Sequence, residues 1–141
     1  MLNPIATPTF NDAAALAAFE ALFAPQAYDP AAALARAQSL LPDSLTGDTH
    51  WLAFLLIITG GELEWVLRHV NFTAERIQVK LIKSKLVDLS SSKEVLLSLA
   101  LHLFNEIHPL PPDGLLNLRH LDDYHFELAL HAIRVHSRGV R

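Results

Sequence analysis

Histidine is the residue whose type and placement could do chemistry in this chain. The 141 residues include eight histidines, and six of them fall between positions 102 and 136. Histidine has an unperturbed pKa close to neutral pH and is the commonest protein ligand for metals. A cluster of this kind therefore raises the prospect of acid–base chemistry or of a metal site. The six residues are His102, His108, His120, His125, His131 and His136.

The spacing of these histidines does not fit a metal site on a single helix. Two histidines of one helix share a metal when they stand three or four residues apart. The successive gaps here are 6, 12, 5, 6 and 5 residues. His120 and His131 share a helical face, but the eleven-residue step between them spans about 16 Å of helix. Our leading interpretation therefore includes neither a metal nor a cofactor.

Mixed ligands from two helices remain as an alternative. Polar residues follow one another at steps of three or four around the expected helix 122–137, and His102 and Glu106 stand four apart on the expected helix 92–107. If these stripes face each other, they form a ligand, metal or acid–base site. The Glu-x-x-His signature of helical di-metal proteins is absent, because Pro109 follows Glu106 at that offset and Leu130 follows Glu127. The candidate residues are His102, Glu106, His120, Asp123, Glu127 and His131.

The same residues also fit the solvated polar face of an amphipathic helix, and this interpretation is the one we favour. His102 interrupts the most apolar expected helix, so we expect its ring to be partly buried. Protonation below about pH 6.5 would add positive charge along the stripe, which predicts a pH-dependent surface or interface. The chain contains no cysteine and no glycine-rich phosphate loop or G-x-S-x-G sequence. These absences remove thiolate catalysis and the usual nucleotide and hydrolase signatures.

A basic segment is the second candidate for function. Residues 76–93 contain five basic residues and one acidic residue, Asp88. If 74–89 is a helix, Arg76, Lys80 and Lys83 lie on one face of it, and Lys85 lies nearby. These four residues are candidates for binding an acidic protein partner. Nucleic acid is a less favoured partner, because the segment lacks interleaved aromatic residues and a recognisable helix-turn-helix.

Composition predicts one folded domain that has more apolar residues than its own core needs. Apolar residues make up 51% and charged residues 18% of the chain, against about 25% charged residues in an average protein. Such an excess is typical of an oligomer interface or an apolar ligand site. Charge is uneven: residues 1–64 hold seven acidic and one basic residue, net −6, and residues 65–141 hold eight acidic and ten basic residues, net +2.

A cytoplasmic protein without a membrane segment is expected. The stretch from Met1 to Phe10 carries no basic residue, whereas a secretory signal begins with basic residues and continues with an apolar run. The longest apolar run, Trp51 to Ile58, is far shorter than the roughly 20 residues of a membrane helix.

Leucine and alanine dominate the chain, and the helix signals are clear over most of it. Residues 50–58 and 95–107 are expected at the centre because they are apolar nearly all round. Residues 76–81 alternate as in a strand, but the wider pattern favours a helix. Ser91 and Glu94 form a capping-box pattern before helix 92–107. The expected helices span 12–24, 30–41, 50–59, 62–70, 74–89, 92–107 and 122–137, with an arm at 1–11 and a proline-rich connector at 108–117.

These observations predict an all-α protein, a compact single-domain bundle of six or seven helices that covers 1–141. The favoured function is that of a small non-catalytic interaction or regulatory protein, which acts through protein–protein contacts and forms a homo-oligomer such as a homodimer. The first alternative is a helical enzyme or a ligand- or metal-binding protein with its site between helices 92–107 and 122–137. The second alternative is nucleic-acid binding through residues 76–93.

Overall fold

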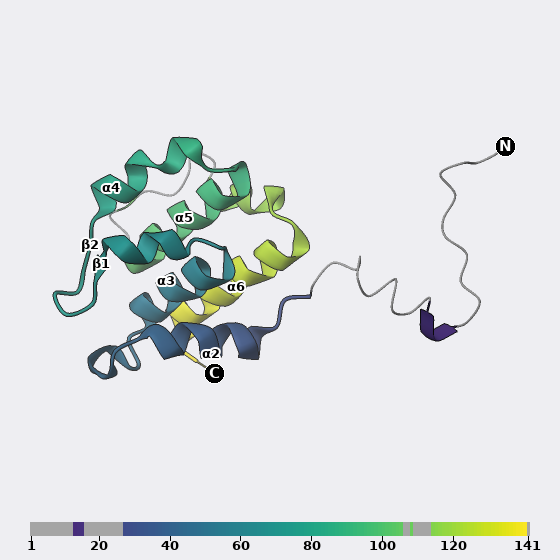
Figure 1. The fold of residues 1–141 in the computed structure, drawn as a ribbon, viewed down its shortest axis with the longest axis horizontal. Coiled ribbons are helices and arrows are strands. Elements are labelled where there is room, and N and C mark those ends of the chain that lie inside the picture. Colours follow the sequence, from purple (N-terminus) through teal and green to yellow (C-terminus); the bar gives the residue numbers. More distant parts are fainter. Residues whose placement is uncertain (1–12, 16–26, 106–107, 109–113, 141) are drawn as a thin grey trace.

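The computed structural model describes residues 13–15, 27–105, 108 and 114–140. These residues form an all-α fold, as predicted, with one very small sheet (Figure 1). Its α-helices are α2 (Pro30–Leu40), α3 (Thr49–Gly60), α4 (Val79–Ser84), α5 (Ser91–Phe104) and α6 (Asp123–Arg138). Its 3-10 helices are η1 (Asp43–Leu45), η2 (Glu64–His69), η3 (Leu86–Asp88) and η4 (Gly114–His120), and its strands are β1 (Val70–Asn71) and β2 (Arg76–Ile77).

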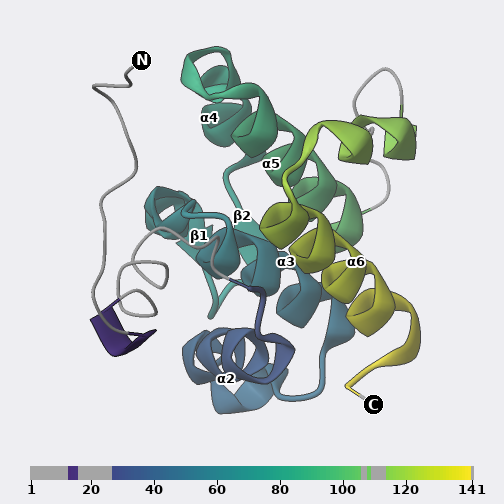
Figure 2. The ribbon, with the colours of Figure 1, turned by 90° about the vertical axis from the view of Figure 1, so that its right-hand side faces the viewer.

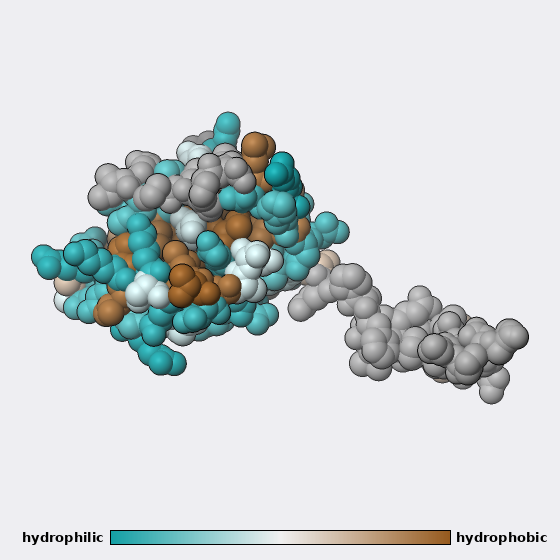
Figure 3. All heavy atoms as spheres, turned by 90° about the horizontal axis from the view of Figure 1, so that it is seen from above, coloured by the Kyte–Doolittle hydropathy of each residue, from teal (hydrophilic) through white to brown (hydrophobic). Residues whose placement is uncertain are grey.

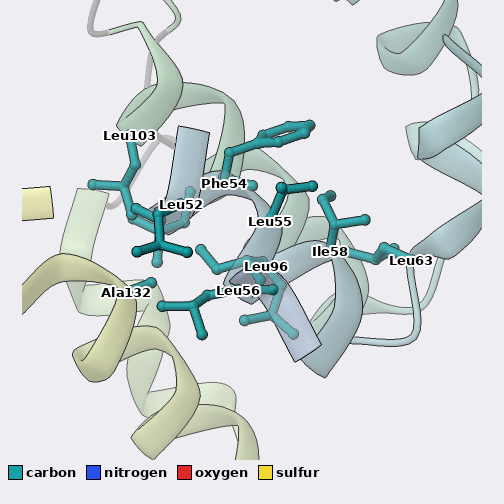
Figure 4. Close-up of a cluster of buried hydrophobic side chains, with 14 of the residues drawn as sticks. Leu52, Phe54, Leu55, Leu56, Ile58, Leu63, Leu96, Leu103 and Ala132 are labelled. Atoms are coloured by element: carbon teal, nitrogen blue, oxygen red, sulfur yellow. The ribbon is translucent and has the colours of Figure 1, made fainter. Parts of the chain in front are cut away.

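Helix α3 is the centre of the fold. Every residue from Trp51 to Ile58 is buried, which is what a helix that is apolar on all sides requires. Helices α2, α5 and α6 each pack mainly against α3. Figures 1 and 2 show α2 on one side of α3 and α5 on the other, with α6 alongside. The close-up in Figure 4 shows Leu52, Leu56 and Ala132 in one apolar cluster. The prediction that 50–58 lies at the centre is therefore confirmed.

Each long helix begins at a polar cap, and one predicted cap was wrong. Asp29, Asp48 and Asp122 accept hydrogen bonds from free amides at the starts of α2, α3 and α6. Helix α5 is capped by Ser90, whose Oγ accepts from the Lys93 amide at 3.3 Å, and not by Ser91. Three consecutive serines offered equivalent caps, so the pattern alone did not determine the start of α5.

The stretch from 62 to 89 departs most from prediction. The expected helix 62–70 is the 3-10 helix η2, and the expected helix 74–89 is interrupted. Strands β1 and β2 pair in an antiparallel hairpin, with Val70 opposite Ile77. The Asn71 side chain accepts the Ala74 amide at 2.9 Å within the turn, and Glu75 adopts a left-handed φ of 53°. The alternation at 76–77 was therefore a strand signal, and a helix begins only at Val79.

Glycine determines how α3 ends and how closely α6 approaches it. A Cβ on Gly60 would lie 2.8 Å from Leu128 Cδ1 of α6, and one on Gly61 would lie 2.7 Å from the Ile57 carbonyl oxygen. A side chain at Gly61 would clash with the backbone, and one at Gly60 would require the Leu128 side chain to shift. Helix α3 thus ends at this glycine pair, which lies between the expected helices 50–59 and 62–70, and Gly61 is its C-cap.

The described part of the chain from residue 108 onward follows the prediction with one difference. Helix α6 begins and ends close to its expected bounds. Part of the expected connector 108–117 is helical, as η4. Most of the expected helix 12–24, the arm 1–11, residues 109–113 of the connector and Glu106 lie outside the described residues. In the part of the chain that is described, no helix has both the length and the apolar character needed to cross a membrane.

Candidate functional site

The basic segment is exposed, but its residues come from different elements. Arg76 lies on strand β2, Lys80 and Lys83 lie on α4, and Lys85 caps the end of α4. All four are exposed. The prediction that Arg76 shares a helical face with Lys80 and Lys83 was wrong, because the strand ends before α4 begins. Within the described ranges, none of the four forms an ion pair of 4.0 Å or less.

Two large apolar side chains are also exposed in the segment that carries these lysines. Leu81 of α4 is 49% exposed and Val87 of η3 is 87% exposed, whereas Ile82 between them is fully buried and holds α4 on the core. We call Lys80, Leu81, Lys83, Lys85 and Val87 the α4 face. Helix α4 lies at the upper edge of Figures 1 and 2, and Figure 3 looks down on this side, where hydrophobic residues stand among hydrophilic ones. This face combines positive charge with apolar area.

His102 of α5 is partly buried, as predicted, and it holds the following chain segment. Its Nδ1–H donates to the carbonyl oxygen of His108 at 2.7 Å. Burial lowers the pKa of His108, and the nearby positive charges of Lys83 and His102 lower it further. The His102 imidazole therefore links the last turn of α5 to the start of the connector at His108. Glu106, the predicted partner of His102, lies outside the described residues.

His131 of α6 is half-buried and bonded to a residue that sequence analysis did not single out. The Tyr28 hydroxyl, just before α2, donates to His131 Nδ1 at 2.5 Å. The Tyr28 ring also makes an edge-to-face contact with Tyr124, at a centroid distance of 5.4 Å. Burial raises the pKa of Tyr28 above its usual range, and burial lowers that of His131, with Arg134 adding to the effect. The two groups are therefore a neutral donor–acceptor pair that joins the entry of α2 to α6.

The other residues of the predicted stripe are exposed. His120 ends η4, and Asp123 and Glu127 lie on α6. His125 instead bonds Asp122, with Nδ1 at 2.9 Å from Oδ1. The His125 backbone N–H, followed by its imidazole, holds the pKa of Asp122 below its usual value. Among the described residues, no group of three or more His, Asp or Glu side chains is placed to hold a metal ion.

The predicted site between helices 92–107 and 122–137 is thus not assembled from its described members. His102 donates a hydrogen bond to the His108 carbonyl after α5, and His131 accepts one from the Tyr28 hydroxyl before α2. Both helices pack mainly on α3. A histidine pair does form elsewhere: the rings of His50 and His136 meet edge to face at 4.6 Å. No spacing rule finds such a pair, because the two residues belong to different helices that meet only in the folded chain.

Two hollows flank the Tyr28–Tyr124 contact. The smaller, of about 170 Å³, is lined by Tyr28, His131 and the apolar residues Leu34 and Val135, with Glu127 and Arg134 also present. The larger, of about 530 Å³, is lined by Arg36 and Tyr124 together with three carboxylates and His125. The charges in both hollows are mixed in sign, so neither selects a ligand class.

Stability is expected to fall in acid partly through His131. A group whose folded pKa is depressed contributes stability above its unfolded value, about 6.5 for histidine, and loses it as the pH falls toward the folded value. In His131→Asn the amide oxygen can replace Nδ1 as acceptor for Tyr28, but it does not titrate. Urea unfolding at pH 8 and pH 5 should show a smaller acid loss for this variant than for the wild type. An equal loss would mean that His131 does not contribute.

Comparison with known proteins gives no relative for this chain. No family model matches it, and no curated protein or solved structure is significantly similar to it.

Proposed function

We propose that this chain is a small non-catalytic regulatory protein that acts through protein–protein contacts, and that its α4 face binds an acidic segment of the partner. One observation carries the proposal. Leu81 and Val87 are exposed in the same segment as Lys80, Lys83 and Lys85, and within the described part of the chain these lysines have no ion-pair partner. Apolar area that remains in water beside uncompensated charge is typical of a contact surface.

The chemistry of the α4 face favours a protein over a nucleic acid. A phosphate backbone would satisfy Lys80, Lys83 and Lys85, but it offers no apolar group to cover Leu81 and Val87. A protein segment with acidic and apolar side chains satisfies both. The carboxylates steer the encounter and the apolar contacts hold the complex. The occupant that fits is therefore an acidic segment with interspersed large apolar residues.

Self-association is the second part of the proposal. Residues 1–64 carry a net charge of −6 and residues 65–141 a net charge of +2. Acidic residues of one copy can therefore attract the α4 face of another. The chain has an excess of apolar residues, and a homodimer would bury part of the apolar area that they expose.

Affinity capture at graded salt, combined with light scattering on the purified protein, tests this function. We expect a bound partner, or a second copy, at about 50 mM salt and its release by about 500 mM, because screening weakens contacts between exposed charges. A monomer that captures nothing at low salt would refute the proposal. Binding that is insensitive to salt would refute the role of the lysines.

A further inference from the structure

The hollow beside the β1–β2 hairpin carries charge of one sign only. It has a volume of about 670 Å³ and is lined by residues of η2, of the hairpin and of the turn between its strands. Arg68 enters from the end of η2 and Arg76 from β2. None of its lining residues is acidic. Its volume lies in the range of about 300–1,000 Å³ that small-molecule sites occupy.

We propose that this hollow binds an oxyanion, a phosphate or carboxylate group of a small molecule, with Arg68 and Arg76 as its main ligands. Guanidinium groups match the geometry of these anions and can donate two parallel hydrogen bonds to them. Both arginines are exposed, and in the described chain neither forms an ion pair within 4.0 Å. Their donors are therefore available to an anion from solvent.

The polar side chains around the arginines favour an anion as well. Asn71 uses its carbonyl oxygen to accept the Ala74 amide at 2.9 Å, which leaves its NH₂ group to donate. His69 Nδ1 lies 3.4 Å from Gln78 Oε1, so the Gln78 oxygen is engaged in the same way and its NH₂ group is left. Each amide oxygen thus accepts a hydrogen bond inside the hairpin, and both NH₂ groups remain to donate. Together with the two guanidinium groups, these donors favour an acceptor-rich ligand.

The walls of the hollow are held in place before any ligand arrives. Val70 pairs with Ile77 across the hairpin, and the Gln78 amide donates to the His69 carbonyl at 2.9 Å. The half-buried Phe72 ring packs against Trp51 of the core at a centroid distance of 5.2 Å. This fixed framework lowers the ordering cost of binding. Glu75, the acidic residue of the turn, does not line the hollow.

NMR titration of the full chain with inorganic phosphate and with succinate, at constant ionic strength, tests the proposal. We expect saturable shifts confined to residues 68–78, and a loss of affinity of about tenfold or more in Arg68→Gln/Arg76→Gln. Saturation by phosphate alone points to a phosphate ester as the natural ligand, and saturation by succinate alone points to a carboxylate. Arg138→Gln, which removes an exposed arginine on α6, is the matched control and should bind like the wild type.

Two outcomes would overturn the proposal. One is the absence of saturation with both anions, and the other is shifts spread evenly over all exposed lysines and arginines. If the double variant does not fold, Arg68→Lys keeps the charge but not the paired donors, and it should still weaken binding. No residue of the α4 face lines the hollow, so Lys80→Gln/Lys83→Gln, which adds no negative charge, should retain oxyanion binding whether or not it loses a protein partner.

Discussion

Replacement of Phe54 by alanine is expected to lower the free energy of unfolding by about 3–5 kcal/mol. Phe54 is fully buried on α3. Its ring lies 6.0 Å from that of Trp51 and 5.7 Å from that of Phe104 of α5, so truncation leaves a cavity between α3 and α5. Because domains are stable by only about 5–15 kcal/mol, this single change should remove a large share of the total.

Equilibrium unfolding in urea measures this effect, with Val87→Ala as the matched control. Val87 is 87% exposed, so its truncation should change stability by no more than about 0.5 kcal/mol. A loss below about 1 kcal/mol for Phe54→Ala, which is the range of an average substitution, would show that α3 is not the centre of the core.

The fold could be predicted where one type of local signal dominated. The unbroken apolar run of α3 and the Asp-Pro start of α2 gave these helices nearly their observed bounds. The stretch from 70 to 84 could not be resolved in the same way. There a two-residue strand pair and a six-residue helix share a window in which both periodicities are present. The choice depends on pairing between Val70 and Ile77, which a pattern within one segment does not show.

Of the candidate sites, only features that depend on single residues or on near neighbours in sequence were predictable. Exposure of Lys80, Lys83 and Lys85 follows from their charge. The partner of His131 is Tyr28, 103 residues away in sequence, and no spacing rule connects the two. Arg68 and Arg76 come together through the hairpin, and the prediction of one long helix at 74–89 concealed this arrangement. Residues brought together by tertiary contacts were thus the part that the chain pattern could not reveal.

Charge reversal at two lysines of the α4 face is expected to weaken partner binding by about tenfold or more. Lys80 and Lys83 are exposed and lie on one short helix. Lys80→Glu/Lys83→Glu converts two attractions toward an acidic segment into two repulsions. Exposed charge pairs are worth only about 0.2–1 kcal/mol each, but reversing the sign of two of them roughly doubles the change, to about 0.8–4 kcal/mol, and most of this range exceeds the 1.4 kcal/mol of a tenfold effect. The fold should persist, because neither side chain is buried.

The most direct test of the account compares partner affinity, or the self-association constant, for three proteins at low salt. They are the wild type, Lys80→Glu/Lys83→Glu and the control Arg119→Glu/Arg138→Glu, which makes the same charge change at exposed positions outside the α4 face. We expect that only the α4 variant loses binding and that the control stays close to the wild type. Equal binding by all three proteins, or equal loss in both variants, would contradict a specific docking role for the α4 face.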